Sequence, residues 1–372
     1  MKICHLTSVH PANDVRIFYK ECTSLKKNGY EVIIIANGAK NEIVNGINII
    51  GTISIRNRFF RILIVPFIIY FKAIKIKAVI YHFHDPELVF CGIFLKLIGK
   101  KVIFDIHENI GISILDKRWI NKPLRKTLFN IYNIIEKCLI TYFDKLIVVS
   151  KLYNKRFPKK SVIIKNYPII NIVETNNKSE FLMPLRFIYV GVINEDRCVF
   201  EMLKIISILS EKKYNIKIDI IGEINGDLLK IKIDKYIEDK NIKDKVSFFG
   251  RLDHSMIFNI MQKSHLGFAL LKPTNNYLNA IPTKIFEYMM FGLPVICSDF
   301  SIYDYYIKEK NTGICIDIKN IDLSVNKIES LINNIDLMKL MSENGMFVVR
   351  NEFNWESEEK KLLKIYQEIT NA

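Results

Sequence analysis

Short apolar runs alternate with longer amphipathic segments along the first half of the chain. Each apolar run is almost continuous, which is typical of strands buried on both faces of a parallel sheet. The predicted strands are Lys2–Thr7, Glu31–Ala36, Ala78–His82, Lys101–Ile106 and Lys145–Ser150. The segments with helical spacing lie between them, at about Arg16–Lys27, Phe59–Lys75, Glu87–Ile98 and Pro123–Tyr142. This alternation predicts a doubly wound, mostly parallel α/β sheet.

The pattern breaks after residue 165 and then starts again. Residues 171–180 are polar and irregular, so we place a linker there. The second series of predicted strands is Leu185–Val190, Ile216–Ile221, Val246–Phe249, His265–Leu271, Leu293–Ser298 and Gly313–Ile318. Predicted helices lie near Phe200–Lys212, Asp227–Asp239, Ser255–Lys263 and Thr283–Phe291, and a charged amphipathic helix follows at Asn354–Thr370. We therefore expect two tandem Rossmann-like domains, which the length of 372 residues also favours at roughly 150 residues per domain.

Composition excludes several classes of protein. Hydrophobic residues make up 49% of the chain, which excludes a disordered protein. The seven cysteines include no Cys-x-x-Cys pair, so the sequence indicates neither a structural zinc site nor a disulfide framework, and we expect a reduced, cytoplasmic protein. The start of the chain lacks the apolar region of a signal peptide. The apolar run Ile62–Phe71 is much shorter than the roughly 20 residues that a spanning helix needs.

The formal net charge of +15 is concentrated in the first half of the chain. Residues 1–165 contain 28 Lys and Arg against 11 Asp and Glu, whereas the remaining residues contain 26 against 28. A basic half attracts nucleic acid, anionic lipid or an anionic substrate, and charge alone leaves all three open.

Polar residues of the first half gather in the loops that follow its predicted strands, where ligands of doubly wound sheets bind. The first loop has no G-x-G-x-x-G dinucleotide fingerprint, and its Asp14 suits the cap of the next helix. In the second loop, His82, His84 and Asp85 look like part of a zinc site, although Asp85-Pro86 also suits a helix start. His107 follows a third strand and could bind a sugar hydroxyl or act as an acid or base.

In the second half, the segment Asn279–Met289 is the strongest candidate. A helix begins near Thr283, and the free N–H groups of its first turn favour a phosphate. Lys284 suits a position beside a diphosphate, and Glu287 could accept hydrogen bonds from ribose, although an ordinary Lys–Glu surface pair is the alternative. Arg197 follows another predicted strand and could neutralise a leaving diphosphate.

Seven stretches of the sequence resemble glycosyltransferase family 4, the retaining nucleotide-sugar enzymes with the GT-B fold. They are HPANDVRIFYKECTSLKKNGYEV (10–32), YHFHDPEL (81–88), KVIFDIHEN (101–109), FDKLIVVS (143–150), FIYVGVINEDR (187–197), IPTKIFEYMMFGLPVICSD (281–299) and FNWESEEKKLLKIY (353–366). Their order and spacing match the family along nearly the whole chain. The resemblance implies an acceptor-binding domain over residues 1–167 and a nucleotide-sugar-binding domain over 168–352, facing each other across a cleft. It also implies a closing helix over 353–372 that packs back on the first domain.

The resemblance also implies roles for individual residues. The catalytic residues would be His107, Arg197 and Lys284. The donor-binding residues would be Gly191, Gly222, Arg251, Asn279, Ala280, Ile281, Thr283 and Glu287. The acceptor-binding residues would be His10, Asp14, Arg16, His84 and Asp85. No metal and no other cofactor would be required, because the two cations and the helix N-terminus would stabilise the charge of the leaving diphosphate.

Three positions depart from the family pattern. Asn279 stands where the first Glu of the family's Glu-x7-Glu motif would fall, Val192 stands where an Arg often follows the glycine, and Cys198 replaces a glycine after the basic residue. Because Asn279 cannot carry the charge of a carboxylate, these departures concern the contacts to the donor sugar.

Basic residues beside apolar ones point to a membrane-bound acceptor. Two clusters carry them: Arg56, Arg58, Arg61, Lys72, Lys75 and Lys77, and then Lys117, Arg118, Trp119, Lys122, Arg125 and Lys126. Such clusters suit an anionic membrane surface, although a solvated basic face is the alternative. We therefore expect a peripheral enzyme at the inner face of the plasma membrane. It would transfer a hexosyl or N-acetylhexosaminyl group to a lipid-linked saccharide. Its pathway would be that of capsule, surface polysaccharide or lipopolysaccharide. No nucleic-acid-binding motif accompanies the charge.

Other functions remain open at this stage. A GT-B sugar-nucleotide epimerase would form product without an acceptor. A metal-dependent hydrolase would use His82, His84, Asp85 and His107. A non-catalytic membrane or nucleic-acid module would follow if Asn279 marks a decayed site.

Overall fold

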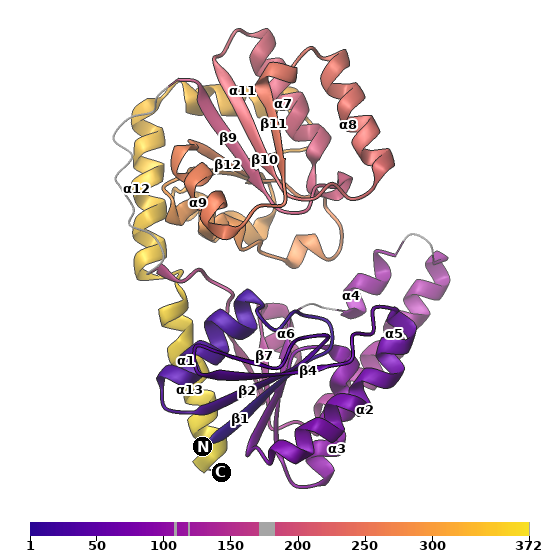
Figure 1. Cartoon of the computed structure of the whole chain (residues 1–372). Helices are drawn as coiled ribbons and strands as arrows, with labels where there is room; N and C mark the ends of the chain where they lie inside the picture. Colours follow the sequence, from indigo (N-terminus) through magenta and orange to yellow (C-terminus); the bar gives the residue numbers. More distant parts are fainter. Residues whose placement is uncertain (108–109, 118–119, 171–182, 372) are drawn as a thin grey trace. The chain divides into compact units, whose positions relative to one another are not determined.

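The computed structural model describes residues 1–107, 110–117, 120–170 and 183–371, and the predicted linker at 171–180 lies outside this part of the chain. The chain divides into two compact units, shown in Figure 1. Unit 1 is Met1–Asn166 together with Trp355–Ala372, and unit 2 is Tyr167–Asn354. The C-terminal helix therefore belongs to unit 1.

Unit 1 is built on an eight-stranded sheet in the order β3-β4-β2-β1-β5-β6-β7-β8. The strands are β1 Lys2–Thr7, β2 Glu31–Asn37, β3 Glu42–Val44, β4 Ile47–Thr52, β5 Ile80–Phe83, β6 Lys101–Ile106, β7 Lys145–Val148 and β8 Ser161–Ile163. All neighbours are parallel except β3 and β4, which form an antiparallel hairpin. The predicted doubly wound α/β fold is confirmed, and β3, β4 and β8 are additions to it.

Successive side chains of a strand point to opposite faces of the sheet, so a continuous apolar strand makes both faces apolar. Helices cover both of these faces. They are η1 Val15–Cys22, α1 Thr23–Lys27, α2 Arg58–Ile76, η2 Pro86–Leu88, α3 Val89–Leu97, α4 Ile110–Leu115, α5 Lys122–Ile140, α6 Lys151–Arg156 and α13 Trp355–Asn371. Cys4 and Leu6 of β1 join the apolar core beneath α2 and α3. His5, between them, lies on the other face and contacts Tyr366 of α13. The helix predicted over about 16–27 is present as η1, which is a π-helix, followed directly by α1.

The C-terminal helix α13 is an integral part of unit 1. Trp355 Nε1 donates a hydrogen bond to Ser24 Oγ at 2.9 Å, and Glu358 Oε2 accepts one from Lys165 N at 3.0 Å. Its apolar stripe of Leu362, Ile365 and Tyr366 is buried. Unit 1 is therefore made of two segments that are far apart in the sequence.

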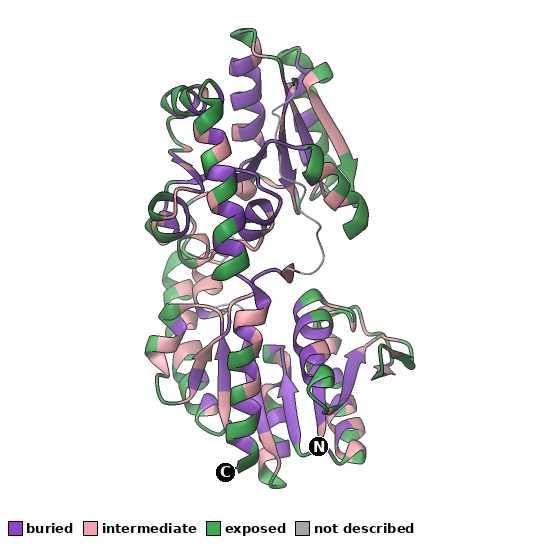
Figure 2. Ribbon diagram, turned by 90° about the vertical axis from the view of Figure 1, so that its left-hand side faces the viewer, coloured by how far each residue is buried: buried purple, intermediate pink, exposed green. Residues whose placement is uncertain are grey.

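Unit 2 has a six-stranded parallel sheet in the order β11-β10-β9-β12-β13-β14. The strands are β9 Leu185–Val190, β10 Ile216–Ile221, β11 Val246–Gly250, β12 Leu266–Ala269, β13 Val295–Ser298 and β14 Gly313–Ile316. The main helices are α7 Val199–Glu211, α8 Asp227–Asp239, α9 His254–Lys263, α10 Lys284–Met290, α11 Ile321–Ile332 and α12 Ile335–Asn351. Short helical turns include η4 Glu195–Arg197 and η6 Tyr277–Asn279. Apolar clusters fill both faces of the sheet, and Figure 2 shows the strands mostly buried and the outer helix faces exposed.

No helix in the described ranges is both long enough and apolar enough to cross a membrane. The apolar run at 62–71 lies within α2, which carries Pro66 in its interior. One side of this helix packs on the sheet through Val65, Ile69 and Ala73. Its other side leaves Phe59, Phe60, Leu63, Phe67 and Phe71 exposed.

Candidate functional site

In unit 2, two cations converge on the loop that follows β9. Gly191 has a φ of +136°, and a Cβ built on it would lie 3.0 Å from both Arg197 Nη1 and Lys284 Nζ. Arg197 is the last residue of η4, where Asn194 Oδ1 accepts a hydrogen bond from Arg197 N at 2.8 Å. Lys284 is the first residue of α10. The fold thus brings together three predicted site residues from two distant segments.

The sequence left open that Lys284 and Glu287 form an ordinary surface pair. The structure excludes this for Lys284, because its side chain is buried. Its Nζ lies 3.8 Å from the centroid of the Tyr189 ring. Burial, and then the charge of Arg197, lower the pKa of Lys284 well below its ordinary value. Within the described part of the chain, no carboxylate forms an ion pair with Arg197 or Lys284. A bound anion would supply the missing negative charge.

Glycine is needed where the loops after β9 and β10 meet. Gly222 has a φ of +145°, and a Cβ on it would lie only 2.0 Å from the carbonyl oxygen of Gly191. Gly222 N also donates to the Gly250 carbonyl at 2.8 Å, so the loop after β11 joins the same edge. Only residues without a side chain permit this backbone contact. Arg251, the next residue, is exposed.

The segment that leads into α10 is held by its own hydrogen bonds. The exposed Asn279 donates from Nδ2 to the Asn275 carbonyl at 3.2 Å, and the Ala280 carbonyl accepts from Tyr303 at 3.3 Å. Ile281 packs against an apolar cluster of unit 2. The helix begins after Thr283, whose carbonyl accepts from the N–H of the half-buried Glu287 at 3.1 Å. Asn279 therefore stays near the surface, while Lys284 turns inward.

Tyrosines beside the two cations were missed by the sequence analysis. Tyr189 Oη donates to the Val192 carbonyl at 2.8 Å, and Tyr288 Oη accepts from Val190 N at 3.0 Å. Both contacts fix the loop that carries Gly191. Burial raises the pKa of Tyr189 to about 12, so its hydroxyl stays neutral beneath Lys284. The sequence does not indicate a functional role for a tyrosine in an apolar strand, because a tyrosine there also suits a position in the core.

In unit 1, Asp85 ties the loop after β1 to the end of β5. Its Oδ2 accepts from Thr7 Oγ1 at 2.7 Å, Ser8 N at 2.6 Å and Val9 N at 3.1 Å. Its Oδ1 lies 2.8 Å from His10 Nδ1. Burial alone would raise the pKa of Asp85, but the contacts with His10, Thr7 and Val9 hold it below its ordinary value. Asp85 does precede the helical turn η2, as predicted, but its side chain makes no cap there.

Arg16 and Asp105 form a second tie, in the interior. Arg16 Nε and Nη2 donate to the two carboxylate oxygens of Asp105 at 2.8 and 3.2 Å, and Nη1 donates to the Ile164 carbonyl at 3.3 Å. Both side chains are buried. Asp14 caps η1 as predicted, by accepting from Arg16 N and Ile17 N. The guanidinium of Arg16 is therefore engaged within unit 1.

His107 lies at the partly exposed edge of this network. Its Nε2 is 3.2 Å from Asp105 Oδ2 and 3.3 Å from Nδ1 of the buried His84. Its ring stacks on that of His10, with centroids 5.1 Å apart. Asp105 and His84 thus orient one edge of the His107 ring. Of the predicted acceptor residues, His10 and Asp14 keep partly exposed side chains, whereas those of Arg16, His84 and Asp85 are buried.

The metal ligands predicted for a hydrolase were His82, His84, Asp85 and His107. The structure does not bring these four residues together as one group of possible ligands. Two groups in the described residues have metal-binding geometry: His84 with Asp105 and His107, and His5 with Glu21, His82 and His84. Asp85 belongs to neither, because its oxygens are used by Thr7, Ser8, Val9 and His10. His5 and Glu21 were missed, since each lies inside a segment whose pattern indicated only a strand or a helix.

Part of the chain is similar to a known family of glycosyltransferases. Residues 173–346 match the family model described as "Glycosyl transferases group 1". An uncharacterised glycosyltransferase of Methanocaldococcus jannaschii is 21% identical over 299 residues, which cover 75% of this chain and 71% of that protein.

Solved structures share the fold over almost the full length of the chain. The sucrose-phosphate synthase of Thermosynechococcus elongatus is similar with a TM-score of 0.78 and 16% identity, covering 100% of this chain and 99% of that one. HepE of Anabaena in complex with UDP and glucose has a TM-score of 0.73, 10% identity and coverage of 99% and 100%. WaaG, a glycosyltransferase involved in lipopolysaccharide biosynthesis, has a TM-score of 0.71, 13% identity and coverage of 97% and 98%. The fold is therefore that of the GT-B glycosyltransferases.

Proposed function

We propose that the protein is a retaining glycosyltransferase of family 4 that uses a nucleotide diphosphate sugar as donor. The observation that carries the proposal is the pair Arg197 and Lys284, two cations beside Gly191 with no carboxylate paired to them in the described residues. Two basic side chains without a carboxylate partner suit a diphosphate, whose oxygens can accept hydrogen bonds from both and favour the charged form of Lys284. The match of residues 173–346 to group 1 glycosyl transferases, and the UDP in HepE, support a nucleotide sugar as its source.

The same pair suits the chemistry of transfer. As the bond between the anomeric carbon and the diphosphate breaks, negative charge grows on the leaving oxygen, and cations already in place stabilise it without a metal. The acceptor hydroxyl would form the new bond on the same face of the sugar, and its proton would pass to the leaving phosphate. Gly191, whose loop is packed against Gly222, would allow the diphosphate to approach the backbone, and Glu287 would hold the ribose.

Unit 1 would bind the acceptor. His107, oriented by Asp105 and His84, would contact the sugar near the reacting carbon, and His10 and Asp14 offer the polar groups that reach the surface. Asn279 would contact the donor as a neutral amide, so this enzyme would hold the sugar by hydrogen bonds rather than by a carboxylate charge.

A thermal-shift screen tests the donor site. UDP, GDP, ADP and CMP and their sugar conjugates would be compared in EDTA, and a nucleotide at about 100 times its Kd stabilises a protein by about 2.7 kcal/mol. We expect a shift with one nucleotide that is lost in Arg197→Ala and in Lys284→Ala. Lys308→Ala is the matched control, since Lys308 is exposed and paired with Asp299 and Asp304. No shift with any nucleotide would contradict the proposal, and product formed without an acceptor would favour an epimerase.

We also propose that the acceptor is lipid-linked and that unit 1 docks on an anionic membrane. The exposed face of α2 combines Phe59, Phe67 and Phe71 with nearby Lys72 and Lys75. Helix α5 repeats the pattern with exposed Leu124, Ile131 and Ile134 and its own lysines and arginine. Arg118 and Trp119 of the second predicted cluster lie outside the described residues. Apolar side chains beside cations suit the interface of a bilayer that carries acidic lipids.

Vesicle flotation tests this docking. We expect binding to vesicles with phosphatidylglycerol, weaker binding to neutral vesicles, and loss of binding in Phe67→Ser/Phe71→Ser. Phe249→Ser is the control, because Phe249 is an exposed aromatic residue of unit 2. Equal binding of both variants, or none by the wild type, would overturn the membrane proposal without affecting the donor site.

A further inference from the structure

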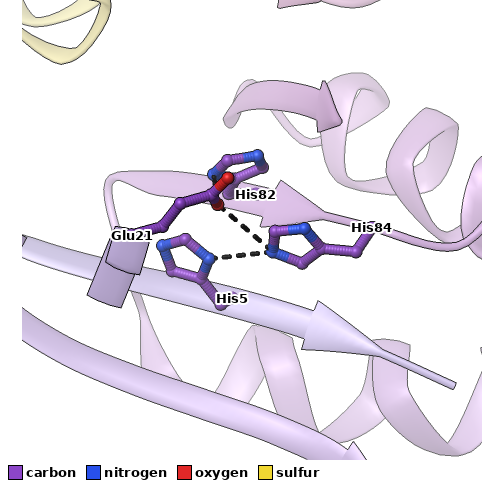
Figure 3. A group of neighbouring side chains, drawn as sticks. All are labelled: His5, Glu21, His82 and His84. Atoms are coloured by element: carbon purple, nitrogen blue, oxygen red, sulfur yellow. Dashed lines mark hydrogen bonds and ion pairs between the residues drawn. The ribbon is translucent and has the colours of Figure 1, made fainter. Parts of the chain in front are cut away.

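Three histidines and one glutamate meet in the interior of unit 1, as Figure 3 shows. His5 of β1 and His82 of β5 are register partners on adjacent parallel strands, and His84 follows two positions along on the same face. Glu21 comes from η1, which packs over this face. All four side chains are almost completely inaccessible to solvent.

The potential ligand atoms are close enough to share one ion. His5 Nδ1 is 2.9 Å from His84 Nε2, and Glu21 Oε2 is 3.8 Å from His82 Nδ1 and 3.9 Å from His84 Nε2. One donor atom from each of the four residues lies within 4.8 Å of all the others. A tetrahedral ion with ligands at about 2.0 Å holds them about 3.3 Å apart. Small side-chain rotations would therefore close the site.

The outward-facing nitrogens of two histidines already have the partners that metal-bound histidines use. His84 Nδ1 lies 3.3 Å from His107 Nε2 and 3.6 Å from Asp105 Oδ2, and Asp105 is itself held by Arg16. His5 Nε2 lies 3.3 Å from the hydroxyl of Tyr366. A carboxylate or hydroxyl at the second nitrogen fixes the ring so that the first nitrogen presents its lone pair to an ion.

Two polar groups in the cluster lack hydrogen bonds among the described residues. Neither oxygen of Glu21 accepts one, and His82 Nε2 has no partner. Arg16 Nε lies 3.1 Å from Glu21 Oε1 and contributes charge there, but Oε2 faces the histidines. A buried carboxylate without hydrogen bonds is costly, so a cation at Oε2 would stabilise the ionised form of Glu21.

We propose that His5, Glu21, His82 and His84 bind one structural Zn²⁺ that links β1, β5 and η1. Three imidazoles and one carboxylate form a ligand set that zinc accepts, and a closed site without an open coordination position is typical of structural zinc. His82 would exchange its 2.7 Å hydrogen bond with Tyr366 for the ion, which leaves Tyr366 to His5. Because the site is closed, the ion would enter during folding. The proposal does not depend on the proposed function, since the donor site lies in unit 2.

Metal analysis of the full-length protein tests the site. Protein from zinc-supplemented cells would be desalted in EDTA and analysed by inductively coupled plasma mass spectrometry, with about one zinc per chain expected for a closed structural site. The content should fall well below this in Glu21→Gln and His82→Gln. His254→Gln, which changes an exposed histidine of unit 2, should keep the wild-type content.

Two further measurements do not depend on variants at the ligands. Tyr366→Phe keeps the shape of the side chain but removes the partner of His5, and it should weaken zinc about 10- to 100-fold in competition with a chromophoric chelator. Wild-type protein refolded from urea with ZnCl₂ should unfold at higher urea concentration than protein refolded in EDTA. A refolded wild-type protein that retains no zinc after desalting would overturn the proposal. Equal zinc in the wild type, Glu21→Gln and His82→Gln would overturn it as well.

Discussion

The two units treat the charges at their strand ends in opposite ways. In unit 1 the buried carboxylates Asp85 and Asp105 each lie against a partner that can carry a positive charge, His10 and Arg16. In unit 2 the described residues form no ion pair between a carboxylate and Arg197 or Lys284, although Lys284 is also buried. Matched charges hold a loop or strand, whereas unmatched ones cost stability until a ligand arrives. Charge balance therefore separates a supporting network from a binding site, even though both consist of the same residue types.

Breaking the pair in unit 1 should give the largest effect. Arg16→Met keeps much of the side-chain volume but leaves Asp105 as a buried carboxylate without its cation. The free energy of unfolding should fall by about 3–5 kcal/mol, measured by urea titration. A loss below about 1 kcal/mol, the range of exposed pairs, would show that this network is not what holds unit 1 together.

Removing a cation from unit 2 should instead change activity. Lys284→Ala or Arg197→Ala should lower kcat by about 100- to 1000-fold with the donor found by the thermal-shift screen, because charge on the leaving group is no longer stabilised. Stability should not fall as it does for Arg16→Met, since no buried carboxylate loses its partner. If either variant keeps the wild-type kcat, or loses activity only because it unfolds, the cations of unit 2 do not differ in role from the charges of unit 1.

The pair of His10 and Asp85 should make the stability of unit 1 depend on pH. Partial burial lowers the pKa of His10, but the hydrogen bond and charge of Asp85 outweigh it and raise that pKa above its ordinary value. Its contribution is then complete below the unfolded pKa of about 6.5 and is lost as pH rises through the folded value. The wild type should exceed His10→Gln in unfolding free energy by more at about pH 6 than at about pH 9. The reverse trend in urea titrations would contradict the pairing.

An exposed ion pair should give the smallest effect. Lys308 lies 2.8 Å from both Asp299 and Asp304, but all three side chains are largely exposed. Lys308→Ala should change the unfolding free energy by no more than about 1 kcal/mol and leave kcat unchanged. A larger loss of unfolding free energy would mean that exposed ion pairs stabilise this protein as much as buried ones do.

Much of the fold could be predicted because buried parallel strands have continuous apolar sequences, as in Glu31–Ala36 and Leu185–Val190. The hairpin β3–β4 was missed because its strands are short and interrupted by polar residues around Asn45 and Gly46. No element was predicted over 321–351, where the structure has α11 and α12 with Asn333 and Asn334 between them.

The candidate site was less accessible to sequence reasoning. Arg197 and Lys284 were separate candidates from their positions after a predicted strand and at a predicted helix start, but no spacing rule brings together residues from such distant segments. His5 was missed because an apolar run such as Lys2–Thr7 indicates only a strand, although a histidine inside it is itself a signal. Its significance depends on Glu21 and Tyr366, which only the folded chain brings to it.

The position of α13 has a consequence for how the protein is made. Unit 2 is one continuous segment, and a ribosome completes it before it reaches Trp355. Unit 1 begins first but waits for its last helix, so the face that holds His5 and Glu21 remains uncovered while the whole of unit 2 is translated. Tyr366 closes that face only after unit 2 has emerged. Unit 1, whose first segment precedes unit 2 in the chain, thus completes its fold only after unit 2 has been translated.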